Sequence, residues 1–80
     1  MFNEKNASLK ISSKLEFLIK TKKIKACDIS EYLGISKQLV SRNRQMLKSG
    51  KLPNSRFLVG VSEYFGENFL YWTHVLNVYN

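Results

Sequence analysis

Two short helical segments joined by only three residues restrict the possible folds of this chain more than any other feature. The first segment runs from Lys25 to Leu33 and the second from Lys37 to Leu47, with Gly34-Ile35-Ser36 between them. So short a junction crosses two helices at about 90–120° and needs a positive φ, which glycine accepts. Ser36 can cap the second helix, and Ser30 is small enough for close crossing. The predicted apolar wedge consists of Ile29, Leu33, Ile35 and Val40.

Helical patterns continue on both sides of this pair. Ser13-Lys14-Leu15-Glu16 has the form of a capping box, which predicts a first helix from Ser13 to about Thr21. The polar residues 1–12 before it are expected to form a loose N-terminal arm or lead-in. After a loop at residues 49–53, Asn54 can cap a helix with regular apolar spacing that Gly66 ends.

The last segment, residues 69–80, is apolar and rich in aromatic side chains. Asn68 can cap a fifth helix there, but residues 73–79 also contain β-branched and aromatic residues typical of strands. Helix and strand both stay open for this segment. The predicted organisation is therefore an arm (1–12), a helical domain (13–68) and a C-terminal apolar segment (69–80).

The charge of the chain is strongly positive and unevenly distributed. Thirteen Lys and Arg residues against six acids give a net charge of +7 and a pI near 9.8. All thirteen lie at or before Arg56, so residues 1–56 carry +9 and residues 57–80 carry −2. Such a balance favours nucleic acid as the partner.

Several classes of protein are excluded by length and composition. Eighty residues build one core, and the chain contains no apolar run of the roughly 20 residues that span a membrane. The N-terminus has no signal-peptide pattern, and the single Cys27 allows no intramolecular disulfide, so a cytoplasmic protein is expected. There is no metal-ligand spacing, phosphate loop or nucleophile–base pattern. We therefore expect no enzyme, no metal, no cofactor and no small-molecule ligand.

The outward face of the second segment of the pair carries long polar side chains near its N-terminus. They are Lys37, Gln38, Ser41, Arg42 and Gln45. Side chains of these types hydrogen-bond to base edges in the major groove, where glutamine can pair twice with adenine. The adjoining Leu39 points partly outward, where it either meets a thymine methyl group or joins the core.

From about Ser13 to Trp72 the sequence resembles the lambda-repressor-like helix-turn-helix family, especially the phage repressor type. The resemblance rests on the order of five segments. These are the first helix, Ile29-Ser30…Leu33-Gly34-Ile35-Ser36…Val40-Ser41-Arg42, a polar loop with Pro53, Phe57-Leu58…Val61…Tyr64-Phe65-Gly66, and Asn68 to Trp72. It implies a compact, all-α, five-helix fold that binds operator DNA, usually as a dimer on a palindrome.

The resemblance also implies roles for particular residues. The base-contacting positions are Lys37, Gln38, Ser41 and Arg42. The predicted phosphate contacts are Lys25, Ala26, Ser36, Arg44, Gln45, Lys48 and Lys51. Ala26 would contribute only its backbone amide. Asn43 replaces an apolar residue of the family, so we expect the end of the second helix of the pair to be displaced or shortened.

The C-terminal segment is predicted to be the dimer interface, because it is hard for so small a domain to bury alone. The interface residues would be Phe69, Trp72, Val75, Leu76, Val78 and Tyr79. The alternative is that the segment completes a monomeric core.

The sequence thus predicts a sequence-specific regulator of transcription that binds double-stranded DNA, most simply a repressor of phage or mobile-element type. One alternative is an antitoxin-type accessory regulator with the same module. Another is a helix-turn-helix that docks on polymerase or a partner regulator. RNA binding is less consistent with the pattern, because most aromatic residues are segregated from the charge.

Overall fold

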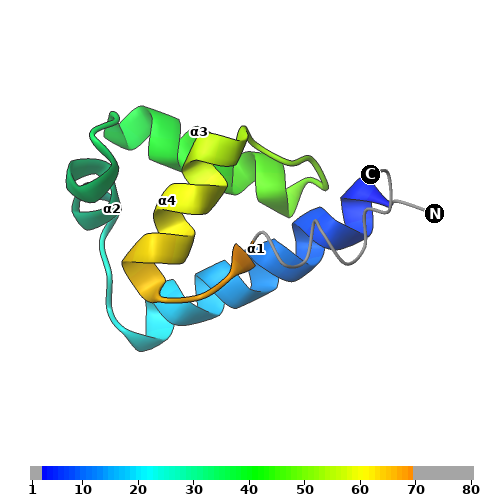
Figure 1. Ribbon diagram of the computed structural model, residues 1–80, viewed down its shortest axis with the longest axis horizontal. Coiled ribbons are helices and arrows are strands. Elements are labelled where there is room, and N and C mark those ends of the chain that lie inside the picture. Colours follow the sequence, from blue (N-terminus) through cyan, green and yellow to red (C-terminus); the bar gives the residue numbers. More distant parts are fainter. Residues whose placement is uncertain (1–2, 70–80) are drawn as a thin grey trace.

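A computed structural model describes residues 3–69 and contains in that range four α-helices (Figure 1). They are α1 (Glu4–Thr21), α2 (Ala26–Leu33), α3 (Lys37–Lys48) and α4 (Ser55–Phe65). No β-strand occurs between residues 3 and 69, so the predicted all-α class is confirmed for this part of the chain. In the view of Figure 1, α1 and α3 lie on opposite sides, α4 lies between them and α2 closes one end.

The first helix begins at Glu4, so the prediction of a loose arm over residues 1–12 is wrong from Asn3 onward. Asn3 is the N-cap residue, and its side-chain oxygen accepts a hydrogen bond from the Asn6 amide at 3.1 Å. The predicted capping box fails for the same reason, because Ser13 lies inside a continuous helix. The capping-box pattern is short enough to occur by chance within a helix.

Two buried serines explain why the first turns of α1 look polar in the sequence. Ser8 and Ser12 lie on the buried side of α1 together with Ala7 and Ile11. The Ser8 hydroxyl is 2.7 Å from the carbonyl oxygen of Leu47 and 2.9 Å from the carbonyl oxygen of Lys51 in the loop after α3. A small hydroxyl group with hydrogen-bond partners can be buried with little loss of stability. The polar residues before Ser13 therefore did not indicate an exposed arm.

The junction between α2 and α3 has the local geometry expected from its residues. Gly34 adopts φ +70°, and the Ser36 side chain accepts a hydrogen bond from the Leu39 amide at 3.1 Å. The Ser30 hydroxyl donates to the carbonyl oxygen of Ile35. The glycine and the serine cap therefore end one helix and begin the next within three residues.

The later helix boundaries mix correct and incorrect predictions. Asn54 caps α4 by accepting from the Phe57 amide at 3.0 Å, and Gly66 ends it with φ +69°, both as predicted. The expected shortening of the second helix of the pair is wrong, because α3 continues to Lys48. Asn43 is only 5% exposed, so an amide occupies the inward position without interrupting the helix.

All four helices contribute to a single core. Ten buried apolar side chains form it: Ile11, Leu15, Leu18, Ile29, Val40, Leu47, Phe57, Leu58, Val61 and Phe69. Phe69 is 1% exposed and its amide donates to the Ser62 hydroxyl at 3.0 Å. Its predicted place in a dimer interface is therefore wrong, since it is buried within its own chain. The other five predicted interface residues and the expected fifth segment beyond Phe69 lie outside the described residues.

The helices α2 and α4 approach each other closely at Gly60. A Cβ atom built on Gly60 would lie 1.7 Å from Cδ2 of Leu33 and 3.1 Å from its Cγ. Gly60 is buried, so the helix surface at this point is a shallow recess that the leucine fills. Glycine inside a helix is unfavourable by about 1 kcal/mol relative to alanine, and the close approach of Leu33 explains its presence here.

We predict that Gly60→Val lowers the free energy of unfolding by about 1–3 kcal/mol, because the branched side chain overlaps Leu33. Urea denaturation followed by circular dichroism measures this. Glu63→Val is the matched control, since it places the same β-branched residue at an exposed position of α4. The loss should shrink in a Leu33→Ala background. Equal effects of Gly60→Val and Glu63→Val would contradict the packing argument.

Candidate nucleic-acid interface

The exposed side of α3 brings together the four residues predicted to contact bases. Lys37, Gln38, Ser41 and Arg42 are all exposed and line one open, shallow surface, which Gln45 also joins. Gln45 was assigned to phosphate contacts from the sequence, but it shares the face of the four base-contact candidates. The opposite side of α3 is buried in the core through Val40, Asn43 and Leu47. The helix is thus divided cleanly into a buried and an exposed side.

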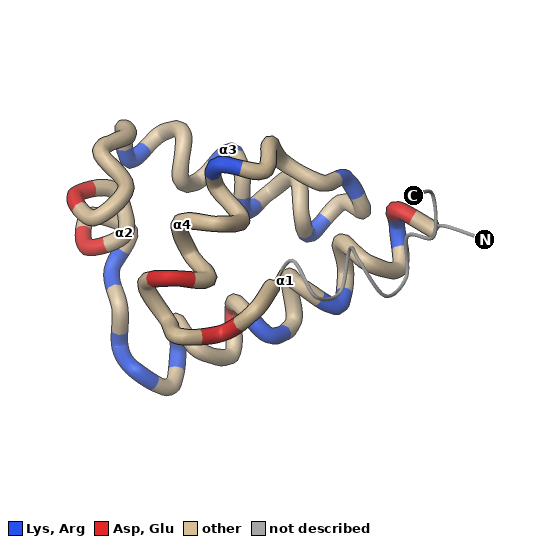
Figure 2. Tube along the Cα trace, in the orientation of Figure 1, with Lys and Arg blue, Asp and Glu red and all other residues tan. Residues whose placement is uncertain are grey.

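No acidic residue occurs in α3, and of its exposed cations only Lys48 approaches an acid among the described residues, namely Glu16 of α1. Lys37 and Arg42 form no ion pair with any residue between positions 3 and 69. Basic residues lie along the whole of α3, whereas acidic residues lie on α1, on α2, near the end of α4 and just after it (Figure 2). Unpaired guanidinium and ammonium groups beside glutamine amides can bind phosphates and base edges.

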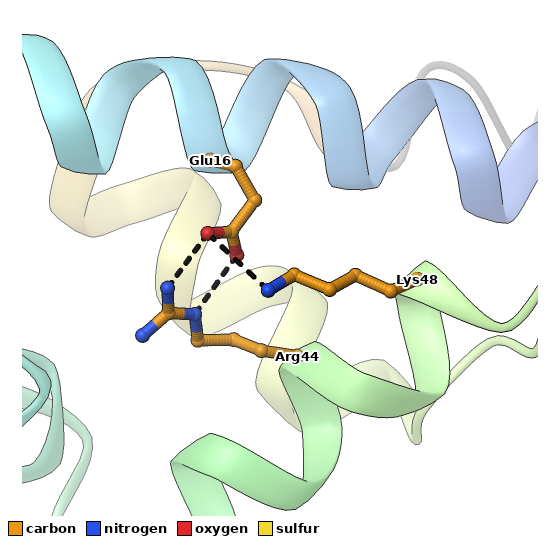
Figure 3. A network of polar contacts seen from close by, with 3 residues as sticks. All are labelled: Glu16, Arg44 and Lys48. Carbon is orange, nitrogen blue, oxygen red and sulfur yellow. Dashed lines mark hydrogen bonds and ion pairs between the residues drawn. The ribbon is translucent and has the colours of Figure 1, made fainter.

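The inward basic residue of α3 is held by α1. Arg44 donates two hydrogen bonds to the Glu16 carboxylate, from Nε at 2.8 Å and from Nη2 at 2.6 Å (Figure 3). The ammonium group of Lys48 lies 3.9 Å from the same carboxylate. The side chains of Arg44 and Glu16 are 22% and 28% exposed. Paired bonds of this kind fix both distance and orientation, so the contact sets the position of α3 relative to α1.

The electrostatics of this contact are mutually reinforcing. The hydrogen bond from Arg44 lowers the pKa of Glu16 below its ordinary value, and the positive charges of Arg44 and Lys48 add to this against the opposing effect of burial. The same hydrogen bond raises the pKa of Arg44. The guanidinium of Arg44 is therefore engaged within the fold, and we remove this residue from the set of phosphate contacts.

The remaining predicted phosphate contacts are spread over three places. Lys25 is the exposed N-cap of α2, and the half-buried Ala26 is the first residue of that helix. Ser36 is exposed, with its hydroxyl oxygen engaged in capping α3. Lys48 and Lys51 are exposed at the other end of α3 and in the following loop. These groups therefore lie at the start of α2, at the start of α3 and at the far end of α3, and they do not form one cluster.

The sequence prediction missed a groove between α3 and the start of α4. Its polar lining residues are Asn43, Asn54 and Arg56, and its apolar lining residues are Leu33, Ile35, Leu39 and Phe57. Leu39 is 38% exposed, between the two alternatives considered for it. The groove unites residues from separate helices, and no spacing in the sequence indicates it.

Comparison of this chain with family models, curated proteins and solved structures gives no match. Among the helices described, none has the length and apolar character needed to cross a membrane. Residues 3–69 contain no group of three or more His, Cys, Asp or Glu side chains placed to hold a metal ion. The exposed side of α3 is the site on which a function can be argued, because it gathers unpaired cations and amides on one surface.

We predict that Glu16→Gln destabilises the protein by about 1 kcal/mol at neutral pH, at the upper end for pairs near the surface. Because the pKa of Glu16 is lowered by folding, the stabilisation is full above the ordinary carboxyl pKa. This stabilisation is lost as the pH falls through the lowered pKa of Glu16. The difference between the parent and Glu16→Gln should therefore shrink in acid, as measured by urea denaturation at several pH values.

The matched control is Glu67→Gln, which removes an exposed pair with Lys14 at 3.9 Å. This substitution should destabilise the protein less than Glu16→Gln does at neutral pH, because the side chains of both Lys14 and Glu67 are well solvated. A Glu16→Gln effect that is the same at pH 7 and in acid would show that the carboxylate makes no such bond in solution.

Proposed function

We propose that this protein is a sequence-specific regulator that binds double-stranded DNA through α3. The observation that carries the proposal is the exposed side of α3, where Lys37, Gln38, Ser41, Arg42 and Gln45 lie on one surface without a neighbouring acid on the helix. A major groove about 12 Å wide admits one α-helix. The excess of +9 in residues 1–56 favours the same partner.

The connection of α2 to α3 supports the interpretation of this pair as a helix-turn-helix. The three linking residues contain the left-handed Gly34 and the capping Ser36, and Ile29 and Val40 are buried in the shared core. In a helix-turn-helix the second helix enters the major groove with its N-terminal residues at the base edges. In this chain the base-contact candidates begin at the first residue of α3.

The chemistry of the exposed side chains suggests how bases would be distinguished. The Gln38 amide can donate to and accept from adenine, and the Arg42 guanidinium can donate twice to guanine. Lys25, Lys48 and Lys51 would contact phosphates on either side and set the register. The bound protein would block access of polymerase to a promoter. This is the action of a phage or mobile-element repressor in the cytoplasm of a bacterial host.

Binding as a dimer is part of the proposal. A palindromic operator presents two half-sites about one helical turn, ~34 Å, apart, and a single copy of α3 reads only one. The partner surface would be the C-terminal segment with Trp72, Val75, Leu76, Val78 and Tyr79. Phe69 is excluded from it because it belongs to the core.

We predict that Gln38→Ala and Arg42→Ala each weaken binding to a site recovered by selection from random duplexes, by roughly 1–3 kcal/mol, with relaxed choice at particular base pairs. Lys51→Ala should weaken selected and random DNA about equally. Fluorescence anisotropy titrations over a range of salt measure both, and log affinity should fall with a slope of about −0.9 per phosphate neutralised.

Three results would contradict the proposal. They are a flat response to salt, an equal preference for structured RNA, and an equal loss on random and selected DNA for all three variants. In the antitoxin-type alternative, the chain still binds the selected DNA specifically, and addition of a partner protein changes its affinity for that DNA. In the protein-docking alternative, Arg42→Ala abolishes capture of polymerase while the parent shows no preference for the selected DNA.

We predict that the full chain is a dimer at high micromolar concentration and that Leu76→Asp and Val78→Asp separately shift it to monomer. The reason is that a charge on a shared apolar surface is strongly unfavourable. Sedimentation equilibrium measures the mass, and a palindromic duplex measures the consequence for binding. A parent that stays monomeric, with variants that bind the palindrome equally tightly, would show that the dimer is absent.

A further inference from the structure

A second basic surface lies away from α3, where α1 ends and α2 begins. Lys20, Lys22, Lys23 and Lys25 occupy four of six successive positions, and all four are exposed. We call them the 20–25 lysine cluster. In Figure 2 they follow the connection from α1 to α2, at the opposite edge of the view from α3.

The cluster is not neutralised by the fold. None of its four lysines forms an ion pair within the described range, residues 3–69. The nearest acid in the sequence, Asp28, uses its carboxylate to accept a hydrogen bond from the backbone amide of Lys25 at 2.9 Å. Four like charges in six residues repel one another, which opposes the compact state. No ion pair among the described residues therefore offsets this repulsion.

The backbone conformation of Lys23 is also unfavourable for a residue with a side chain. Lys23 is the only residue other than glycine with a positive φ in the described part of the chain, at +55°. The equivalent left-handed positions that end α2 and α4 are Gly34 and Gly66, with φ of +70° and +69°. A left-handed residue after a helix is usually glycine, because a Cβ atom is strained there. A lysine at this position is unfavourable for folding, whereas α2 and α4 use glycine at theirs.

The helix end does not explain this lysine. Cations near the C-terminus of a helix are favoured by its dipole, and Lys20 and Lys22 benefit from this at the end of α1. Glycine at position 23 would keep the backbone bond in which the Ile24 amide donates to the Ile19 carbonyl at 2.9 Å. The lysine side chain is thus unnecessary for the turn, and its exposed ammonium group is available to contact an external partner.

We propose that the 20–25 lysine cluster binds the phosphate backbone of the operator duplex outside the base pairs that α3 reads. This inference rests on the proposed function of α3. Lys25 links the two surfaces, since it directly precedes α2 and was already predicted to contact phosphate. Lysine binds phosphate as a point charge without a fixed geometry, which suits exposed side chains that no neighbour orients. The cluster adds affinity and lengthens the footprint without reading sequence.

The experiment compares the full chain with Lys22→Gln and Lys23→Gly on two duplexes. One ends at the outermost base pairs recovered by selection, and the other carries about one further helical turn on each side. We expect each variant to bind the long duplex several-fold more weakly than the parent does, with little change on the short one. The salt slope on the long duplex should become shallower by about 0.9 per lysine removed.

Thermal stability provides a readout that a purely structural role would move in the other direction. Lys23→Gly should raise the Tm, because glycine adopts the left-handed conformation without strain, while the same variant loses affinity. Lys23→Arg should keep the affinity. The matched control is Lys5→Gln, which removes one exposed charge near the other end of α1 and should leave the long-to-short difference unchanged.

The inference is overturned if Lys22→Gln and Lys23→Gly bind the long duplex as tightly as Lys5→Gln does. It is also overturned if they lose affinity equally on both duplexes. In either case a continued loss of specific binding in Arg42→Ala leaves the proposed function of α3 standing. Failure of the parent to prefer the selected duplex over random DNA would remove both proposals together.

Discussion

The contact between Leu33 and Gly60 holds α2, and with it the start of α3, close to α4. Because Gly60 has no side chain, α2 lies close against α4 with Leu33 over the recess. Only three residues separate the end of α2 from the start of α3, so the placement of α2 leaves α3 little freedom at its N-terminus. The residues proposed to read bases begin at that end. A packing contact between α2 and α4 thus restricts the position of the helix that carries the exposed polar side chains.

The far half of α3 is held by a different kind of interaction. Glu16 on α1 holds Arg44 by two hydrogen bonds, and Lys48 lies within ion-pair distance. The basic residues of α3 therefore point in two directions. Arg44 faces α1 and is paired with Glu16, whereas Lys37 and Arg42 face solvent and form no ion pair among the described residues. One carboxylate thus fixes the helix without reducing the charge of its exposed side. This division explains how a small fold can keep a concentrated positive surface.

The features that the sequence predicted correctly are those set by neighbouring residues. Gly34, Ser36, Asn54 and Gly66 act within one helical turn, so their roles as caps follow from residue type and position. The errors arise where a distant partner decides. Ser8 is buried because carbonyl groups some forty positions along the chain accept its hydroxyl. Likewise, nothing near Arg44 in the sequence indicates that Glu16, 28 residues away, would engage it.

The composition of the α3 surface favours nucleic acid over a protein partner. The centre of a protein–protein interface is usually formed by aromatic and aliphatic anchors that become desolvated, with few charges. On α3 the exposed surface consists of two cations, two amides and a hydroxyl, and the large apolar groups beside it, Leu39 among them, line the adjoining groove. The most exposed aromatic side chains of the described residues, Phe17 and Tyr32, are on α1 and α2. A protein partner that used this domain would find its anchors on those helices, whereas α3 offers hydrogen-bond donors matched to base edges and phosphates.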